Sequence, residues 1–247
     1  MTSLAYTVEG AEDGPVLALV HGFMSSRLQW ELNTARLGRR HRLVLIELPG
    51  HGQSVAPDDP ESYRPPAVLA ALDAIRNALA LDRWWLVGHS MGGAISARYA
   101  LRYPDATAGL VTTNSRAIFG VGGSAGPSRP TGPDLRRLPF HPIHAKRFPA
   151  DLKARMVTAA DDMAPFVIDH IGTAAPDWRS GDDLHRLRVP TLLVNGVWEK
   201  AFQPHAEHVR NHLPGIVIVD LDGGHSINIE QAEAFDRAVL DFVSEAG

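Results

Sequence analysis

Cysteine is absent from the 247 residues, which excludes disulfide bonds, thiolate metal sites and a cysteine nucleophile. No apolar run approaches the roughly 20 residues of a membrane-spanning helix. The first residues also lack the basic and apolar segments of a secretion signal. We therefore expect a cytoplasmic protein with no membrane partner.

An excess of charge of one sign is also missing. Acidic and basic residues are interspersed, and the formal net charge is -4. Binding to nucleic acid or to an anionic surface would require a basic excess, so neither partner is expected. The sequence favours a small molecule that is neutral or modestly charged, and it indicates no cofactor and no metal.

What the chain does contain is a series of short apolar segments that alternate with segments of helical periodicity. Such alternation is typical of an α/β fold, in which helices cover both faces of a mostly parallel sheet. Residues 68–79 and 235–243 place apolar side chains on one helical face. The predicted buried strands are residues 16–20, 43–48, 84–87, 110–113, 191–195 and 216–219.

The alternation breaks between residues 115 and 187, where the next strand comes far later than a normal crossover requires. Residues 120–133 are rich in glycine and proline and predict a loop, whereas residues 151–171 predict helix. We interpret residues 115–187 as a small cap inserted before the last strands, over the sheet edge where open α/β folds bind ligands. Residues 1–114 and 188–247 would form the core of a single-domain protein.

The segment Gly88-His89-Ser90-Met91-Gly92 joins the predicted strand at 84–87 to a helical segment. Strand, G-x-S-x-G motif and helix in immediate succession are what a nucleophile elbow requires, a tight turn that exposes the serine hydroxyl at the sheet edge. The competing interpretation is a strand-to-helix turn in which Ser90 caps the helix. The context favours Ser90 as a nucleophile.

A serine hydroxyl needs a base within hydrogen-bond reach and a third group that orients the base. Among the histidines, His225 follows a buried strand near the C-terminus and would lie above the same sheet edge. Glu199 follows the strand at 191–195 and is the candidate acid. Asp220 and Asp222 remain alternatives because they precede His225 closely.

Two backbone N–H groups usually stabilise the developing oxyanion in acyl transfer. One would come from Met91, the residue after the nucleophile, and the other from Phe23 in the loop after the first buried strand. His21 and His51 lie in His-Gly turns, where structural hydrogen bonding is the favoured role, and His89 is expected to point away from Ser90.

Four motifs together resemble the α/β-hydrolase superfamily in the order that such enzymes use, and the resemblance spans nearly the whole chain outside residues 115–187. The motifs are HGF at 21–23, ELPGHGQS at 47–54, GHSMG at 88–92 and GH at 224–225. The resemblance implies Ser90 as nucleophile, His225 as base and the amides of Phe23 and Met91 as oxyanion donors. Glu199 stands where an aspartate is usual, and Glu47 also replaces a common aspartate.

The expected function is therefore a serine hydrolase that cleaves small esters, lactones or thioesters through a Ser-His-Glu triad and an acyl-enzyme. Residues 196–202 and 227–230 are also similar to the menaquinone-pathway lyase called SHCHC synthase, which would use the triad for proton abstraction. Ala94 stands where that family tends to have an arginine, so the lyase is the alternative. A ligand-binding receptor derived from a hydrolase is a third interpretation, whereas dehalogenase and epoxide hydrolase chemistry would require aspartate in place of Ser90.

Two further clusters of polar side chains are best interpreted as solvent-exposed surface. His205, His208 and His212 share a helical face that could hold a metal, but no carboxylate completes the set. A run of basic residues in the predicted cap could bind a substrate carboxylate or phosphate. Its members are Arg136, Arg137, His141, His144, Lys146 and Arg147.

Overall fold

The structure is a computed structural model that describes residues 3–119, 138–140 and 144–246. The described residues form one seven-stranded sheet in the order β1-β3-β2-β4-β5-β6-β7. β1 is antiparallel to β3, and every other neighbouring pair is parallel, which confirms the predicted mostly parallel α/β fold. The strands are β1 (Tyr6–Gly10), β2 (Val16–Val20), β3 (Arg42–Ile46), β4 (Trp84–Gly88), β5 (Thr107–Thr112), β6 (Thr191–Gly196) and β7 (Ile216–Leu221).

Six of these strands coincide with the predicted segments, but the sequence analysis missed β1. This strand lies at the sheet edge, pairs with one neighbour and is largely exposed, so its residues show no apolar pattern. Val8, which is paired with Val44, is 41% exposed. The pairing of β1 therefore depends on backbone hydrogen bonds, which leave no signature in a sequence.

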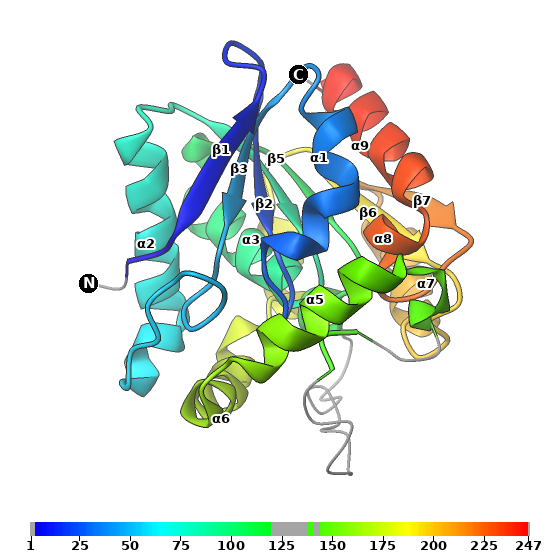
Figure 1. The fold of residues 1–247 in the computed structure, drawn as a ribbon. Helices are drawn as coiled ribbons and strands as arrows, with labels where there is room; N and C mark the ends of the chain where they lie inside the picture. The colour runs from blue at the N-terminus through cyan, green and yellow to red at the C-terminus, as the bar shows by residue number, and fades with distance from the viewer. Residues whose placement is uncertain (1–2, 120–137, 141–143, 247) are drawn as a thin grey trace.

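Helices cover both faces of the sheet because successive strand side chains point to opposite sides. Leu17 and Leu19 of β2 pack with side chains of α1 and α9, and Ala18 and Val20 pack with those of α2 and α3. Figure 1 shows the first pair of helices together on one face. The helices outside residues 115–187 are α1 (Glu31–Leu37), α2 (Pro65–Ala78), α3 (Met91–Arg102), α7 (Gln203–His212), α8 (Ile227–Glu230) and α9 (Ala232–Ala246), with the short 3-10 helices η1 (Arg27–Trp30), η2 (Pro60–Tyr63) and η3 (Pro104–Ala106).

Between β5 and β6 the described chain is helical, and α5 and α6 lie at the end of the sheet where the parallel strands terminate (Figure 1). The helix predicted over 151–171 is interrupted, because Pro165 has no N–H to continue α5 and instead begins α6. The loop predicted at 120–133 lies outside the described residues. The elements of this segment are α4 (Arg116–Phe119), η4 (His144–Arg147), α5 (Ala150–Asp161), α6 (Pro165–Ala174), η5 (Ala175–Trp178) and η6 (Gly181–Arg186).

Candidate active site

Ser90 occupies a tight turn between the end of β4 and the start of α3. Its φ of 52° and ψ of -112° lie outside the backbone regions that residues other than glycine normally adopt. A Cβ on Gly92 would lie 2.2 Å from the carbonyl oxygen of Val20, and one on Gly88 would lie 2.5 Å from that of Gly92. Both glycines are therefore required by the close approach of backbones around Ser90.

The side chains of Ser90, His225 and Glu199 form a hydrogen-bonded chain across three loops at one sheet edge. The distance from Ser90 Oγ to His225 Nε2 is 2.9 Å, and that from His225 Nδ1 to Glu199 Oε2 is also 2.9 Å. Since a carboxylate accepts, Nδ1 carries the hydrogen and Nε2 is left to accept from the serine hydroxyl. This arrangement can deprotonate Ser90 and hold the resulting imidazolium.

The electrostatics of the pair strengthen the base. Burial alone would lower the pKa of His225, but the charge and hydrogen bond of Glu199 outweigh it, so this pKa lies above its ordinary value. Burial acts to raise the pKa of Glu199, but His225, a hydrogen bond with Asn114 and the charge of Arg116 hold it below its usual range. Glu199 is therefore ionised and His225 is a stronger base than a free imidazole.

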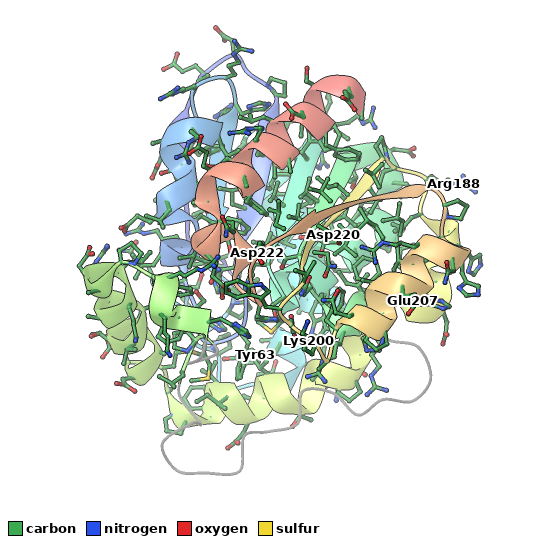
Figure 2. All side chains as sticks on the ribbon, turned by 90° about the vertical axis from the view of Figure 1, so that its right-hand side faces the viewer. Tyr63, Arg188, Lys200, Glu207, Asp220 and Asp222 are labelled. Atoms are coloured by element: carbon green, nitrogen blue, oxygen red, sulfur yellow. The ribbon has the colours of Figure 1, made fainter. Side chains whose placement is uncertain are left out.

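The alternative acids Asp220 and Asp222 contact other partners. Asp220 on the edge strand β7 accepts hydrogen bonds from Asn195 and Arg210, and Asp222 accepts one from the indole N–H of Trp198. Figure 2 labels both aspartates on this side of the molecule. Of the three candidate acids, the structure brings Glu199 to His225.

The amide groups predicted as oxyanion donors come from two segments, Met91 from the start of α3 and Phe23 from the loop after β2. Within the described part of the chain, neither Phe23 N–H nor Met91 N–H donates a hydrogen bond. The Phe23 loop is fixed by two buried imidazoles: His21 Nδ1 donates to the Gly22 carbonyl at 2.7 Å, and His51 Nε2 accepts from Met24 N–H at 3.2 Å. The structural role expected for these histidines is confirmed.

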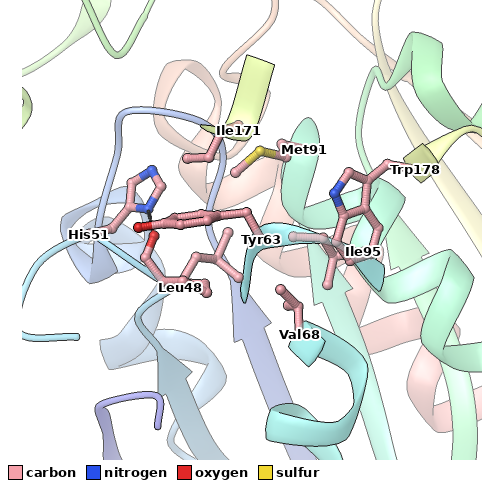
Figure 3. Close-up of a pocket in the computed structure, with 9 residues that line it drawn as sticks. Leu48, His51, Tyr63, Val68, Met91, Ile95, Ile171 and Trp178 are labelled. Carbon is pink, nitrogen blue, oxygen red and sulfur yellow. Dashed lines mark hydrogen bonds between the residues drawn. The ribbon is translucent and has the colours of Figure 1, made fainter. Parts of the chain in front are cut away.

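A small apolar cavity lies beside the elbow and beneath α6 (Figure 3). Its volume of about 10 Å³ has room for about one water molecule. Met91 and Ile95 of α3 line it, and the side chain of Ile171 of α6 lies beside that of Met91 (Figure 3). The other lining residues are Leu48, Pro49, His51, Tyr63, Val68 and Trp178.

Asn114 is a site residue that the sequence analysis missed. Its side chain accepts from Gly196 N–H at 3.0 Å and donates to the Gly196 carbonyl at 2.9 Å, and it helps to lower the pKa of Glu199. It therefore ties the end of β5 to the loop that carries the acid. The sequence feature that could have indicated it is the run of polar residues 113–115, which directly follows the buried strand β5.

The histidine cluster on α7 and the basic run make local contacts. His205 packs on Phe202, and the rings of His208 and His212 stack with centroids 4.3 Å apart. In the basic run, the Arg147 guanidinium lies 3.9 Å from the ring centroid of Trp198. The run members Arg136, Arg137 and His141 lie outside the described residues.

Among the described residues, no helix is long and apolar enough to cross a membrane.

Comparison with known proteins agrees with this architecture. The chain is 25% identical over 275 residues to a Bacillus subtilis protein provisionally assigned as 2-succinyl-6-hydroxy-2,4-cyclohexadiene-1-carboxylate synthase, with 96% of this chain and 93% of the relative covered. It is 26% identical to a Pseudomonas savastanoi protein provisionally assigned as the carbamate hydrolase RutD, with 94% and 95% covered.

A solved hydrolase structure from Pseudomonas aeruginosa superposes with a TM-score of 0.82 at 25% identity and covers 97% of this chain and 94% of its own. The sequence profile of the alpha/beta hydrolase fold family matches residues 15–163, which include β2 to β5 and the serine elbow. The chain therefore belongs to the alpha/beta hydrolase fold family.

Proposed function

We propose that the protein is a serine hydrolase that cleaves small carboxylic esters or lactones through a covalent acyl-enzyme. The observation that carries the proposal is the unbroken chain from Ser90 through His225 to Glu199, with both distances at 2.9 Å. A neutral imidazole that is held by a carboxylate and receives the serine hydroxyl is poised for general base catalysis.

In the proposed mechanism, His225 Nε2 takes the Ser90 proton as Oγ attacks the substrate carbonyl carbon. The N–H groups of Phe23 and Met91 would bind the oxyanion, and each such donor contributes on the order of 3 kcal/mol to transition-state stabilisation. His225 then protonates the departing alkoxide oxygen. Water attacks the acyl-enzyme and gives a proton to His225, which passes it to Ser90 Oγ as the bond to the acyl carbon breaks, so that the acid leaves and both side chains are restored.

The preference for a small, largely apolar substrate is supported by the cavity beside Met91. Its lining combines apolar side chains of α3 and α6. Its volume of about 10 Å³ is too small for a substrate, so these side chains would have to move to admit one. We propose that residues 115–187 act as a cap over this site and that α6 contributes the side chains that select the substrate. The similarity to a carbamate hydrolase and to a hydrolase of known structure also favours hydrolysis.

A lyase that uses the same triad for proton abstraction is the second candidate, and the similarity to the Bacillus subtilis synthase favours it. Ala94 argues against it, because this fully buried position in α3 presents no cation where the resembling lyases tend to have an arginine. The two candidates differ in whether Ser90 is acylated.

Turnover of nitrophenyl esters of graded acyl length tests the proposal. We expect multiple turnovers with short acyl chains and a burst of nitrophenol equal to the enzyme concentration where deacylation is slow. Ser90→Ala should abolish both, and Ser244→Ala, at an exposed position on α9, should abolish neither. Wild-type protein that turns over no ester of the series would contradict hydrolysis, and release of product without any acylated Ser90 would favour the lyase.

A further inference from the structure

The backbone on both sides of His225 is held by a single carboxylate. Glu230 Oε2 accepts from Gly224 N–H at 2.7 Å, and Glu230 Oε1 accepts from Ser226 N–H at 3.0 Å. Glu230 is 7% exposed and ends the short helix α8, so the carboxylate is itself well fixed. The N–H groups of the residues before and after His225 therefore share one buried partner.

The carbonyl group of His225 is held by the histidine of the elbow. His89 Nε2 lies 3.1 Å from the His225 carbonyl oxygen, and the two rings contact each other with centroids 5.1 Å apart. Because a carbonyl can only accept, Nε2 carries the hydrogen. Burial lowers the pKa of His89 to about 3, so the ring is uncharged near neutral pH. His89 thus turns away from Ser90 and binds the loop of the base.

This loop needs external support because it begins with Gly223 and Gly224, which restrict the backbone little. The Gly223 carbonyl accepts from Trp198 N–H at 2.8 Å, which ties the loop to the segment that carries Glu199. His89 ties it to the nucleophile, and Glu230 ties it to α8. The contacts of these two side chains leave the His225 side chain facing Ser90 and Glu199.

We propose that Glu230 and His89 are positioning residues that together fix the His225 imidazole between Ser90 and Glu199. This inference rests on the proposed function. Within the part of the chain that the structure describes, the charged and titratable groups that act on His225 are Glu199, Glu230 and His89, together with Arg116 of α4. Glu230 has a second effect, because its negative charge adds to the proton affinity of His225 whereas Arg116 opposes it.

Replacement of Glu230 by glutamine tests both effects. The amide of Glu230→Gln can accept one N–H but presents its own donors to the other, so the loop loses part of its support. We expect kcat to fall roughly 10- to 100-fold, since small misplacements of catalytic groups have effects of that order, and KM to change little. The acidic limb of the kcat/KM profile should move to lower pH. Glu233→Gln removes an exposed charge three residues away on α9 and should match wild type in both respects.

A measurement independent of turnover separates this inference from the proposed function. Titration of the His225 ring followed by ¹⁵N NMR should give a lower pKa in Glu230→Gln than in wild type and Glu233→Gln. An unchanged His225 pKa with wild-type kcat would overturn the proposal. A second result would overturn the positioning role of Glu230 but leave the proposed function standing. In it, Ser90→Ala abolishes ester turnover and Glu230→Gln leaves turnover intact.

His89 provides a second pair of variants in case Glu230→Gln does not fold. Glutamine at position 89 can still donate to the His225 carbonyl, whereas leucine of similar size cannot. We expect His89→Gln to keep most of the wild-type kcat and His89→Leu to lose roughly 10-fold or more. Equal kcat values in the two variants would overturn the role of His89.

Discussion

At the scale of single residues, the proposed acid, Glu199, is the component that departs from the usual pattern. Glu199 has one methylene group more than an aspartate, and it lies in a tight turn in which its N–H donates to the Gly196 carbonyl at 3.2 Å. This short turn keeps the backbone close to β6, and the longer side chain spans the remaining distance to His225. Side-chain length and turn geometry are therefore matched.

Removal of the Glu199 charge should cost more activity than stability. We expect Glu199→Gln to lower kcat by roughly 10³- to 10⁴-fold, because an orienting carboxylate in a triad has an effect of that order. Glu199→Asp should also lower kcat, since the shorter side chain no longer reaches His225 from this turn. Steady-state kinetics check both variants, with Glu207→Gln on the exposed face of α7 as the control. Near-normal activity of Glu199→Gln would remove Glu199 from the triad.

The pH dependence of kcat/KM should report His225. Burial opposes protonation of this ring, but Glu199 outweighs it and raises the pKa above the ordinary value of 6.5. The base is active when unprotonated, so activity should fall as pH decreases, with a midpoint above 6.5. A kcat/KM profile between pH 4 and 9 measures this midpoint. A midpoint below 6.5 would contradict the electrostatic assignment.

At the scale of elements, the elbow is the part whose geometry tolerates least change. A Cβ on Gly92 would lie 2.2 Å from the carbonyl oxygen of Val20 and 2.3 Å from that of His21, whereas a Cβ on Gly172 in the last turn of α6 would meet no atom within 4 Å outside its own part of the helix. We expect Gly92→Ala to lower the free energy of unfolding by about 1–3 kcal/mol or more through overpacking. Gly172→Ala should raise it by about 0.5–1 kcal/mol because alanine is the better helix former. Urea denaturation checks both, and equal stabilities would contradict the account of the elbow.

The elements also show what a sequence can predict. Strands β2 to β6 are buried on both faces, so nearly continuous apolar runs identified them, and the elbow motif located Ser90 between strand and helix. β1 was missed because its exposed edge position requires no apolar side chains. The division of residues 151–171 into α5 and α6 could have been read from Pro165. The contacts of Asn114 with Gly196 depend on loops brought together by the fold, and local patterns do not encode them. Those of Glu230 join it to Gly224 and Ser226, six and four positions earlier in the chain.

At the scale of the whole molecule, the site is surrounded by imidazoles that are buried and uncharged. Burial lowers the pKa of His51 to about 4 and that of His89 to about 3, and it also lowers the pKa of His21. The neighbouring histidines oppose protonation further, since His51 acts on His21 and His225 acts on His89. The loops that carry Phe23 and His225 thus depend on neutral rings.

These rings should make the fold sensitive to acid. An unfolded chain takes up protons on histidine as pH falls below 6.5, whereas buried His51 does so near 4, so stability present above 6.5 is lost across this interval. The shift of the His51 pKa from 6.5 to about 4 corresponds to at most roughly 3 to 4 kcal/mol of stability. We expect the free energy of unfolding in urea to fall less with pH in His51→Gln than in wild type. His185→Gln at an exposed position should retain the wild-type slope, and identical slopes in all three proteins would contradict this account.

The central claim is that Ser90 is a nucleophile activated by His225, and covalent labelling tests it most directly. A fluorophosphonate should add one phosphonyl group to the wild-type protein, and mass spectrometry of peptides should locate it on Ser90. Ser90→Ala should remain unlabelled, and His225→Ala should react orders of magnitude more slowly. Absence of labelling in folded wild-type protein, or a label on another serine that persists in Ser90→Ala, would contradict the account.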